Sequence, residues 1–344
     1  MSSEPLLEVE NLTIEYETRQ GPLTAVSNAD FTVGEGEYFG LVGESGCGKS
    51  TLAKSIIGGL DDNGKIASGK LKYRGEEIQD LSDAQLNEKI RWKEIAYIPQ
   101  ASMNSLDPLQ RLSEQAIEIA NVHTDLTDKE ALTQFKEMFE VVGLPENRIR
   151  DYPHEFSGGM QQRAIIALAL FLKPSIIIAD EPTTALDVIM QDQIFKYLDE
   201  IRGATDTSMI LITHDISLVF ETCDELAVMH GGQIAETGRI TDVYDNPKHP
   251  YSYLLQRAFP DIRYPDRELE TIEGTPPQQF GDVDYCTFAN RCPWAEEGCR
   301  DAAPELEVSD RSAENHRASC FRSKEIFEQQ DPDESLAAIR GDQA

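Results

Sequence analysis

The stretch YFGLVGESGCGKSTLAKS, residues 38–55, joins an apolar run, a glycine-rich turn and a segment with helical spacing. It satisfies the pattern G-x-x-x-x-G-K-[ST], whose fixed positions are held by Gly43, Gly48, Lys49 and Ser50. A strand that enters such a turn and a helix that leaves it are the context in which this pattern forms a phosphate-binding loop. The stretch therefore predicts a parallel α/β sheet with a phosphate site at the end of one buried strand.

The residues of this loop have distinct expected tasks. Glycines allow successive backbone N–H groups to turn inward around phosphate oxygens, and the N-terminus of the following helix adds its dipole. We expect Lys49 to bridge the β- and γ-phosphates of ATP and Ser50 to coordinate Mg²⁺, whereas Cys47 contributes through its backbone. The nucleotide-binding residues expected in the loop are Gly43, Glu44, Ser45, Gly46, Cys47, Gly48, Lys49, Ser50 and Thr51.

The segment SIIIADEP, residues 175–182, reads as a second buried strand with two acids at its end. Ligands of open α/β sheets bind at the carboxyl ends of the strands. We expect Asp180 to hold Mg²⁺ and Glu181, which points in another direction, to polarise the water that attacks the γ-phosphate. Paired acids usually belong to a solvated face, but the apolar strand before them and the phosphate loop favour a catalytic role.

The order of elements along the chain predicts one α/β domain followed by a smaller extension. Strand-like and helix-like segments alternate from the N-terminus to about residue 238, with a mostly helical insertion expected over residues 81–172. The pattern then becomes rich in Pro and Tyr, and we expect a cysteine-containing extension over residues 239–325. Residues 326–344 read as a polar, disordered tail.

The composition narrows the class of protein. Sixty-two acidic residues face 31 basic ones, for a net charge of −31, so nucleic acid is not an expected partner. The acid is dispersed and Lys is scarce, which favours a salt-rich cytoplasm, with an ordinary acidic protein as the alternative. No apolar run approaches the eighteen or so residues that span a bilayer, and the N-terminus does not resemble a secretory signal. We therefore expect a soluble, intracellular protein.

A second glycine-rich turn, FSGGMQQR over residues 156–163, needs an explanation, because one nucleotide requires one phosphate cradle. We expect Ser157, Gly158 and Gly159 to form another anion-binding helix N-terminus. A helical insertion separates this turn from the first loop, so it is expected to reach the γ-phosphate of ATP held by another subunit. Two chains would then sandwich two nucleotides, and hydrolysis would open the clamp.

These motifs together resemble the ATP-binding subunits of ATP-binding-cassette (ABC) transporters, over nearly the whole chain. SGGMQ is similar to that family's LSGGQ signature, with Phe156 in place of Leu and Met160 where many members have Gln. The resemblance implies an α/β cassette with a P-loop core sheet, an N-terminal antiparallel β subdomain and an α-helical subdomain. It also implies an ATPase whose two catalytic sites form between subunits.

The same resemblance gives roles to four further residues. Tyr16 would stack on adenine, and Gln100 in AYIPQ would sense Mg²⁺ and the attacking water. Asp187 in TALD would couple the two sites, and His214 in ITHD would contact the γ-phosphate and hold the geometry around Glu181. Tyr16 could instead be an ordinary strand aromatic, and a single His at a strand end is often only a satisfied polar residue.

The C-terminal part resembles one branch of this family. DNPKHPYSYLL, residues 245–255, followed by cysteines, is similar to the ATPases of dipeptide, oligopeptide and nickel importers. In the N-terminal half, GKIASGKLKYRG, residues 64–75, resembles their D-type subunit. The resemblance implies a second, homologous ATPase as heterodimer partner, two transmembrane permeases, an extracellular substrate-binding protein and a peripheral position on the cytoplasmic side of the cell membrane. Peptides are the expected cargo. The alternatives are oligosaccharides, nickel, or a soluble cassette ATPase unconnected with transport.

Four cysteines lie in this extension, at Cys286, Cys292, Cys299 and Cys320. A cytosolic chain does not favour structural disulfides, and the short C-x₂₋₄-C spacing usual in zinc sites is absent. Four thiolates suit a [4Fe–4S] cluster, which members of the resembled family carry in this region. We expect a cluster with a structural role, with Zn²⁺ or free thiols as alternatives.

Overall fold

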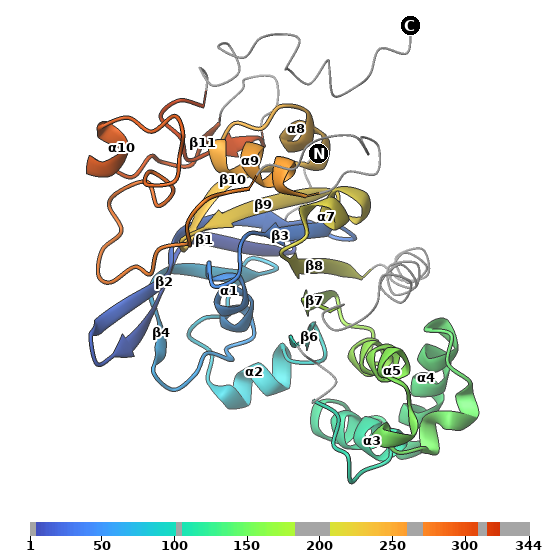
Figure 1. The fold of residues 1–344 in the computed structure, drawn as a ribbon. Coiled ribbons are helices and arrows are strands. Elements are labelled where there is room, and N and C mark those ends of the chain that lie inside the picture. Colours follow the sequence, from blue (N-terminus) through green and yellow to red (C-terminus); the bar gives the residue numbers. More distant parts are fainter. Residues whose placement is uncertain (1–4, 101–104, 183–206, 260–270, 309–314, 324–344) are drawn as a thin grey trace, which may run out of the picture.

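The computed structural model describes residues 5–100, 105–182, 207–259, 271–308 and 315–323. In these ranges the chain forms two β-sheets, a group of helices beside one edge of the larger sheet, and a C-terminal extension at its opposite edge (Figure 1). No helix within the described ranges has both the length and the apolar character needed to cross a bilayer.

The smaller sheet is antiparallel, with strand order β2-β1-β4-β5. Its strands are β1 (Leu7–Thr18), β2 (Gly21–Val33), β4 (Gly64–Tyr73) and β5 (Glu76–Glu77). Apolar and polar residues alternate along β1, so one face is buried against the rest of the molecule and the other is wetter. This is the half-buried strand that the N-terminal sequence predicts.

The larger sheet has strand order β11-β12-β10-β9-β3-β8-β7-β6. Its strands are β3 (Tyr38–Val42), β6 (Ile95–Ile98), β7 (Ile176–Asp180), β8 (Ser208–Thr213), β9 (Glu225–His230), β10 (Gln233–Arg239), β11 (Glu307–Val308) and β12 (Arg317–Ala318). The strands from β9 to β6 pair in parallel, and β3, β7 and β8 are buried along their whole lengths. Continuous apolar runs of this kind are typical of parallel strands covered on both faces.

The described helices fall into three groups. In the first group, α1 (Lys49–Ile56) follows β3, α7 (Ile216–Thr222) follows β8, and α2 (Asp83–Lys89) lies between β5 of the smaller sheet and β6 of the larger one. The helical subdomain contains α3 (Leu112–His123), α4 (Asp128–Val141), the short turns η2 (Glu146–Arg150) and η3 (Pro153–Glu155), and α5 (Gly158–Leu170). The extension contributes α8 (Ile240–Asp245), α9 (Pro250–Ala258) and α10 (Gly298–Asp301).

Two hydrophobic clusters hold these layers together. One lies between the two sheets and includes residues of α1, with Phe31 stacked on Phe39 at 5.0 Å between ring centroids. The other covers the opposite face of the larger sheet and continues into the helical subdomain, where Phe135 contacts Phe139 edge to face. Apolar area removed from water stabilises each layer by roughly 25 cal/mol per Å².

The α/β class and the cassette architecture expected from the sequence are confirmed. Within residues 81–172, expected to be mostly helical, Ile95–Ile98 form β6, which pairs with β7 at the edge of the parallel sheet. The extension packs onto the rest of the molecule, because β12 pairs with β10 and Tyr251 and Phe288 belong to the same hydrophobic cluster as the helical subdomain. Residues 326–344 lie outside the described part of the chain.

One pH-dependent contribution to stability follows from Glu37, at the start of β3. Burial, with repulsion from Glu225 and Asp224, raises the pKa of Glu37 from 4.5 to about 7, while the N–H of Gly34 donates to its carboxylate and opposes the shift. The folded state therefore keeps a proton that the unfolded chain releases above about pH 4.5. Stability from this group is present below that pH and is lost as pH rises toward 7.

We expect Glu37→Gln to raise the free energy of unfolding by about 2 kcal/mol at pH 8 and to change it little below pH 4.5. Denaturant unfolding monitored by circular dichroism across this range measures the effect. The matched control is Glu35→Gln, since Glu35 is exposed and its ion pair with Arg74 contributes little. A difference between wild type and Glu37→Gln that is independent of pH would contradict the assignment.

Candidate functional site

The phosphate loop joins β3 to α1, as the sequence predicts, and its glycines are required by close contacts with the backbone. Gly48 has φ 108°, and a Cβ there would lie 2.3 Å from the carbonyl oxygen of Ala25 in β2. A Cβ on Gly43 would lie 2.1 Å from the carbonyl oxygen of Met229 in β9. The loop is thus wedged between two strands of different sheets, and no other residue fits at these positions.

The ammonium group of Lys49 is fixed by hydrogen bonds to the backbone of the loop. Its Nζ donates to the carbonyl oxygens of Gly43 at 2.7 Å and Glu44 at 2.9 Å, and only 5% of the residue is exposed. Burial of an ammonium group is costly unless it is hydrogen-bonded, and here the loop backbone supplies the acceptors. The charge is therefore fixed over the concave side of the loop, where a phosphate group can meet it.

A cavity of about 270 Å³ opens beside the loop and brings together most of the residues expected to bind nucleotide. The expected residues that line it are Tyr16, Ser45, Gly46, Gly48, Lys49, Ser50, Thr51, Gln100 and Glu181. Gly43, Glu44 and Cys47 belong to the loop but do not line the cavity. Tyr16, on β1, lines the cavity and carries an aromatic ring that can stack on a base.

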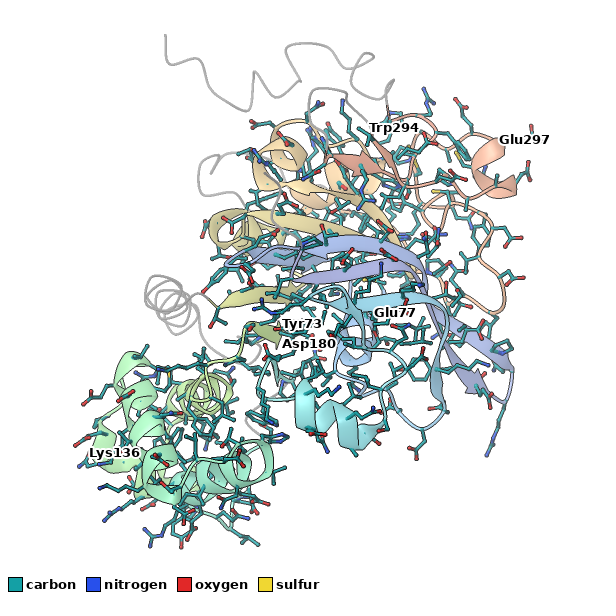
Figure 2. The ribbon with its side chains drawn as sticks, turned by 180° about the vertical axis from the view of Figure 1, so that it is seen from behind. Tyr73, Glu77, Lys136, Asp180, Trp294 and Glu297 are labelled. Atoms are coloured by element: carbon teal, nitrogen blue, oxygen red, sulfur yellow. The ribbon has the colours of Figure 1, made fainter. Side chains whose placement is uncertain are left out.

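Asp180 ends β7 deep in the molecule, and Figure 2 shows it near the centre, far from Lys136 of the helical subdomain. Its Oδ2 accepts a hydrogen bond from the Tyr97 hydroxyl at 2.9 Å. Its Oδ1 is buried with no hydrogen-bond partner among the described residues, and Ser50 lies close enough to interact with the carboxylate. Burial, with repulsion from Glu181, raises the pKa of Asp180, while Ser50, Tyr97 and Lys49 oppose the shift. An orphaned buried carboxylate oxygen beside a hydroxyl fits a Mg²⁺ site.

Glu181 is the centre of a small polar cluster. The Gln100 amide donates to Oε2 at 2.8 Å, and Nδ1 of His214 lies 3.3 Å from Oε1. The backbone of Glu181 has φ 48°, a left-handed conformation that is uncommon for a residue with a side chain. Such backbone strain is often found at functional sites. The three side chains therefore converge from β7, β8 and the segment after β6.

The second glycine turn opens α5, as the sequence predicts, but it does not line this cavity. Ser157 is the N-cap of α5, and within the described structure its side chain makes no capping hydrogen bond. Ser157 and Gly158 are exposed, while Gly159 is buried. The turn lies in the helical subdomain, at the start of α5. Asp187 lies outside the described residues.

The sequence did not indicate that the extension forms one wall of the cavity. Pro277, Gln278 and Gln279 line it together with Thr24 of β2 and the turn Gly231–Gly232. Gln279 accepts the backbone N–H of Thr24 at 2.9 Å, and the Thr24 hydroxyl donates to Gly281 at 2.7 Å. Both contacts are accepted by backbone carbonyl groups of residues 257 or fewer positions away in sequence, in an irregular segment, so no local pattern could have identified them.

The four cysteines of the extension lie in one region but do not form a ligand set in this structure. All four are free and partly buried, and the thiol of Cys320 is close enough to the other three to feel their charge. Burial raises the pKa of Cys292 to about 11 and that of Cys320 to about 12. Among the described His, Cys, Asp and Glu residues, no group of three or more is arranged to hold a metal ion. The expected [4Fe–4S] ligation is therefore not assembled here.

Comparison with known proteins gives two matching family descriptions and many relatives. "ABC transporter" matches residues 26–184, and "Oligopeptide/dipeptide transporter, C-terminal region" matches residues 235–299. The oligopeptide transport ATP-binding protein OppD of Salmonella typhimurium is 42% identical over 301 residues, which cover 87% of this chain and 89% of that protein. The dipeptide transport ATP-binding protein DppD of Bacillus subtilis is 41% identical, over 84% of this chain and 87% of its own length.

Solved structures agree with this. The dimeric structure of MJ0796, a bacterial ABC transporter cassette, superposes with a TM-score of 0.60 at 29% identity and covers 68% of this chain and 98% of that one. CbiO1 of Clostridium perfringens, part of the ABC transporter complex cbiONQ, superposes with a TM-score of 0.59 at 28% identity, over 70% of this chain and 91% of that one.

The close backbone contacts around the loop predict that two glycine substitutions lower the stability of the protein by different amounts. Gly46 and Gly48 both have positive φ, but a Cβ on Gly46 meets no protein atom within 4 Å. We expect Gly46→Ala to cost about 1–2 kcal/mol of backbone strain. Gly48→Ala adds a clash with the Ala25 backbone and should cost more than about 3 kcal/mol. Thermal unfolding without nucleotide measures both, and equal losses would contradict the wedge.

Proposed function

This chain belongs to the family of ATP-binding subunits of oligopeptide and dipeptide ABC transporters, and from that premise we propose that it hydrolyses ATP to drive peptide import through a membrane permease. The observation that carries the proposal is the cluster of Glu181, Gln100 and His214 at the mouth of the phosphate-loop cavity. A carboxylate held between an amide and an imidazole beside a triphosphate site can take a proton from water.

The residues expected to bind nucleotide or to act in catalysis then have distinct roles in hydrolysis. The loop amides and Lys49 bind and orient the phosphates, and Tyr16 receives the adenine ring. Mg²⁺, held by Ser50, Asp180 and Gln100, would neutralise charge on the β- and γ-phosphates when bound. Glu181 accepts the proton of the attacking water, while His214 keeps that carboxylate oriented and contacts the γ-phosphate.

We infer that the site is completed by a second subunit. Ser157, Gly158 and Gly159 open the 13-residue helix α5 and lie outside the chain's own cavity. Free N–H groups at a helix N-terminus bind anions, so this turn suits the γ-phosphate of ATP on a neighbouring ATPase. One structural relative is described as a dimer, which supports the arrangement. Asp187 belongs to the TALD motif, and from this match alone we expect it to couple the two ATP sites.

The proposed assembly follows from the transporter family. It contains a second, homologous ATPase as heterodimer partner, two transmembrane permeases and an extracellular substrate-binding protein, with this chain on the cytoplasmic side of the membrane. Related ATPases for oligosaccharides or nickel are the alternatives for the cargo. We also infer that the net charge of −31 is an adaptation to a salt-rich, halophilic cytoplasm, where screening removes self-repulsion.

We also propose that Cys286, Cys292, Cys299 and Cys320 hold a structural [4Fe–4S] cluster, with Zn²⁺ as the alternative. Their common region in the extension and their buried thiols support the proposal, although the described thiols do not form a ligand set. A bound cation would offset the desolvation that now favours their neutral forms. The proposed role is to stabilise a loop-rich segment, and no step of hydrolysis depends on it.

Glu181→Gln tests the assignment of the general base. We expect this variant to bind MgATP, to form a stable nucleotide-sandwiched dimer with its partner ATPase, and to lose about 10²–10⁴-fold in turnover. Phosphate release and size-exclusion chromatography measure the two effects. Glu297→Gln, on the exposed surface of the extension, is the matched control. Turnover at the wild-type rate in Glu181→Gln would refute the assignment.

Cys292→Ser tests the metal proposal. The wild-type protein purified without air should contain iron and absorb near 400 nm, in about the region of iron–sulfur charge transfer. Cys292→Ser should lose both, whereas Cys223→Ser should keep both, because Cys223 lies outside the extension. A wild-type protein that contains zinc would favour the alternative metal, and one without either metal would rule out both.

A further inference from the structure

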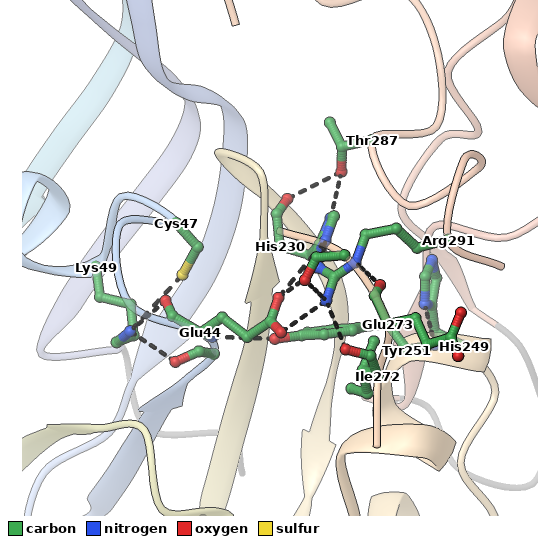
Figure 3. A network of polar contacts seen from close by, with 12 residues as sticks. Glu44, Cys47, Lys49, His230, His249, Tyr251, Ile272, Glu273, Thr287 and Arg291 are labelled. Atoms are coloured by element: carbon green, nitrogen blue, oxygen red, sulfur yellow. Dashed lines mark hydrogen bonds and ion pairs between the residues drawn. The ribbon is translucent and has the colours of Figure 1, made fainter. Parts of the chain in front are cut away.

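Glu44 places a negative charge in the phosphate loop, one residue after its first glycine. An unpaired carboxylate here would repel the triphosphate and weaken its binding. In the structure Glu44 faces away from the cavity, toward Arg291 of the extension (Figure 3). Nη1 of Arg291 lies 2.5 Å from Oε2 of Glu44, and Nη2 lies 2.8 Å from Oε1. The geometry is a two-point ion pair, which fixes orientation as well as charge.

Arg291 has a partner for each nitrogen of its guanidinium group. Its side chain is 7% exposed, and Nη1 also lies 3.0 Å from Nε2 of His230. Its other acceptors are the backbone carbonyls of Ile272, Glu273 and Gly274. A lysine could not reach the carboxylate and these carbonyls at once, because it has a single donor atom.

The hydrogen bonds of His230 leave one ring nitrogen unprotonated, so that it can accept a hydrogen bond from Arg291. The Thr287 hydroxyl donates to the His230 carbonyl at 3.0 Å, so its oxygen is free to accept from Nδ1–H, also at 3.0 Å. This leaves Nε2 as the acceptor for Arg291. Burial, with repulsion from Arg291, lowers the pKa of His230 to about 3, so the imidazole stays neutral.

The carbonyls bound by Arg291 belong to the segment that leads to the cavity wall. Three residues after Gly274, the chain reaches Pro277, Gln278 and Gln279, which line the nucleotide cavity beside Tyr16. Arg291 therefore contacts both the back of the phosphate loop and the start of the wall opposite it. Tyr251 adds a second contact to the loop, since its buried hydroxyl accepts the backbone N–H of Glu44 at 3.0 Å.

We propose that Arg291 is a positioning residue for nucleotide binding, which neutralises Glu44 and ties the phosphate loop to the extension segment that walls the cavity. The inference rests on the proposed ATPase function and goes beyond it by making the C-terminal extension part of the nucleotide site. Arg291 does not touch the nucleotide. It acts through Glu44 and through residues 272–274.

The test is the affinity of the full-length chain for MgATP, measured by displacement of a fluorescent ATP analogue, for wild type and a set of variants. Arg291→Met should weaken binding at least about tenfold, because Glu44 is left charged and unpaired. Adding Glu44→Gln to Arg291→Met should recover part of that loss, since it removes the charge that repels the phosphates. A purely structural role for Arg291 would give no such recovery.

Two further variants make the result decisive. Arg317→Met removes another ion pair between the extension and the core, with Asp30 of β2, and should leave the affinity within about twofold. Arg291→Lys keeps the charge and should fold even if Arg291→Met does not, yet it should still weaken binding several-fold. Thermal unfolding without nucleotide reports how much each variant loses in stability alone.

The outcomes separate this inference from the function it rests on. Wild-type affinity in Arg291→Lys or Arg291→Met, or a double variant weaker than Arg291→Met, would overturn the positioning role and leave the ATPase assignment intact. A wild-type chain that does not bind MgATP would overturn the ATPase function and the inference with it. Partial recovery in the double variant, with normal binding in Arg317→Met, supports the role.

Discussion

The contact of Gly48 with the backbone of Ala25 is the constraint on which the site depends. Two strands from different sheets, β2 and β9, approach the phosphate loop so closely that neither Gly48 nor Gly43 can carry a side chain. This approach positions the N-terminus of α1 and the ammonium group of Lys49 at the cavity. The same approach brings the antiparallel sheet, through β2, against the loop at the end of β3.

The parts of the site that the sequence predicts lie within short, continuous motifs. The β3–loop–α1 unit follows from one motif, and the acids at the end of β7 and His214 after β8 follow from short apolar runs that can only be buried strands. The resemblance implies that His214 holds the geometry around Glu181, and the two side chains lie 3.3 Å apart. Gln100, whose role comes from the same resemblance, follows β6 and also contacts Glu181.

The rest required contacts between distant residues. Arg291 and Glu44 are 247 positions apart, and a single Arg in an irregular segment carries no signal of its partner. The wall formed by Gln279 depends on backbone pairing with β2, which any side chain would allow. β6 was missed because four residues inside a charged, helix-rich region are too few to show an alternating pattern, and they become a strand only through pairing with β7.

The ion pair between the phosphate loop and the extension limits which substitutions and truncations such a chain can tolerate. A cassette that ends after β10 would lack Arg291 and Tyr251. Glu44 would then be an uncompensated charge in the phosphate loop. Loss of the C-terminal segment during evolution would thus demand a simultaneous substitution at the loop. A change at Glu44 or Arg291 alone would leave one charge without its partner, so the two positions, 247 residues apart, are expected to change together.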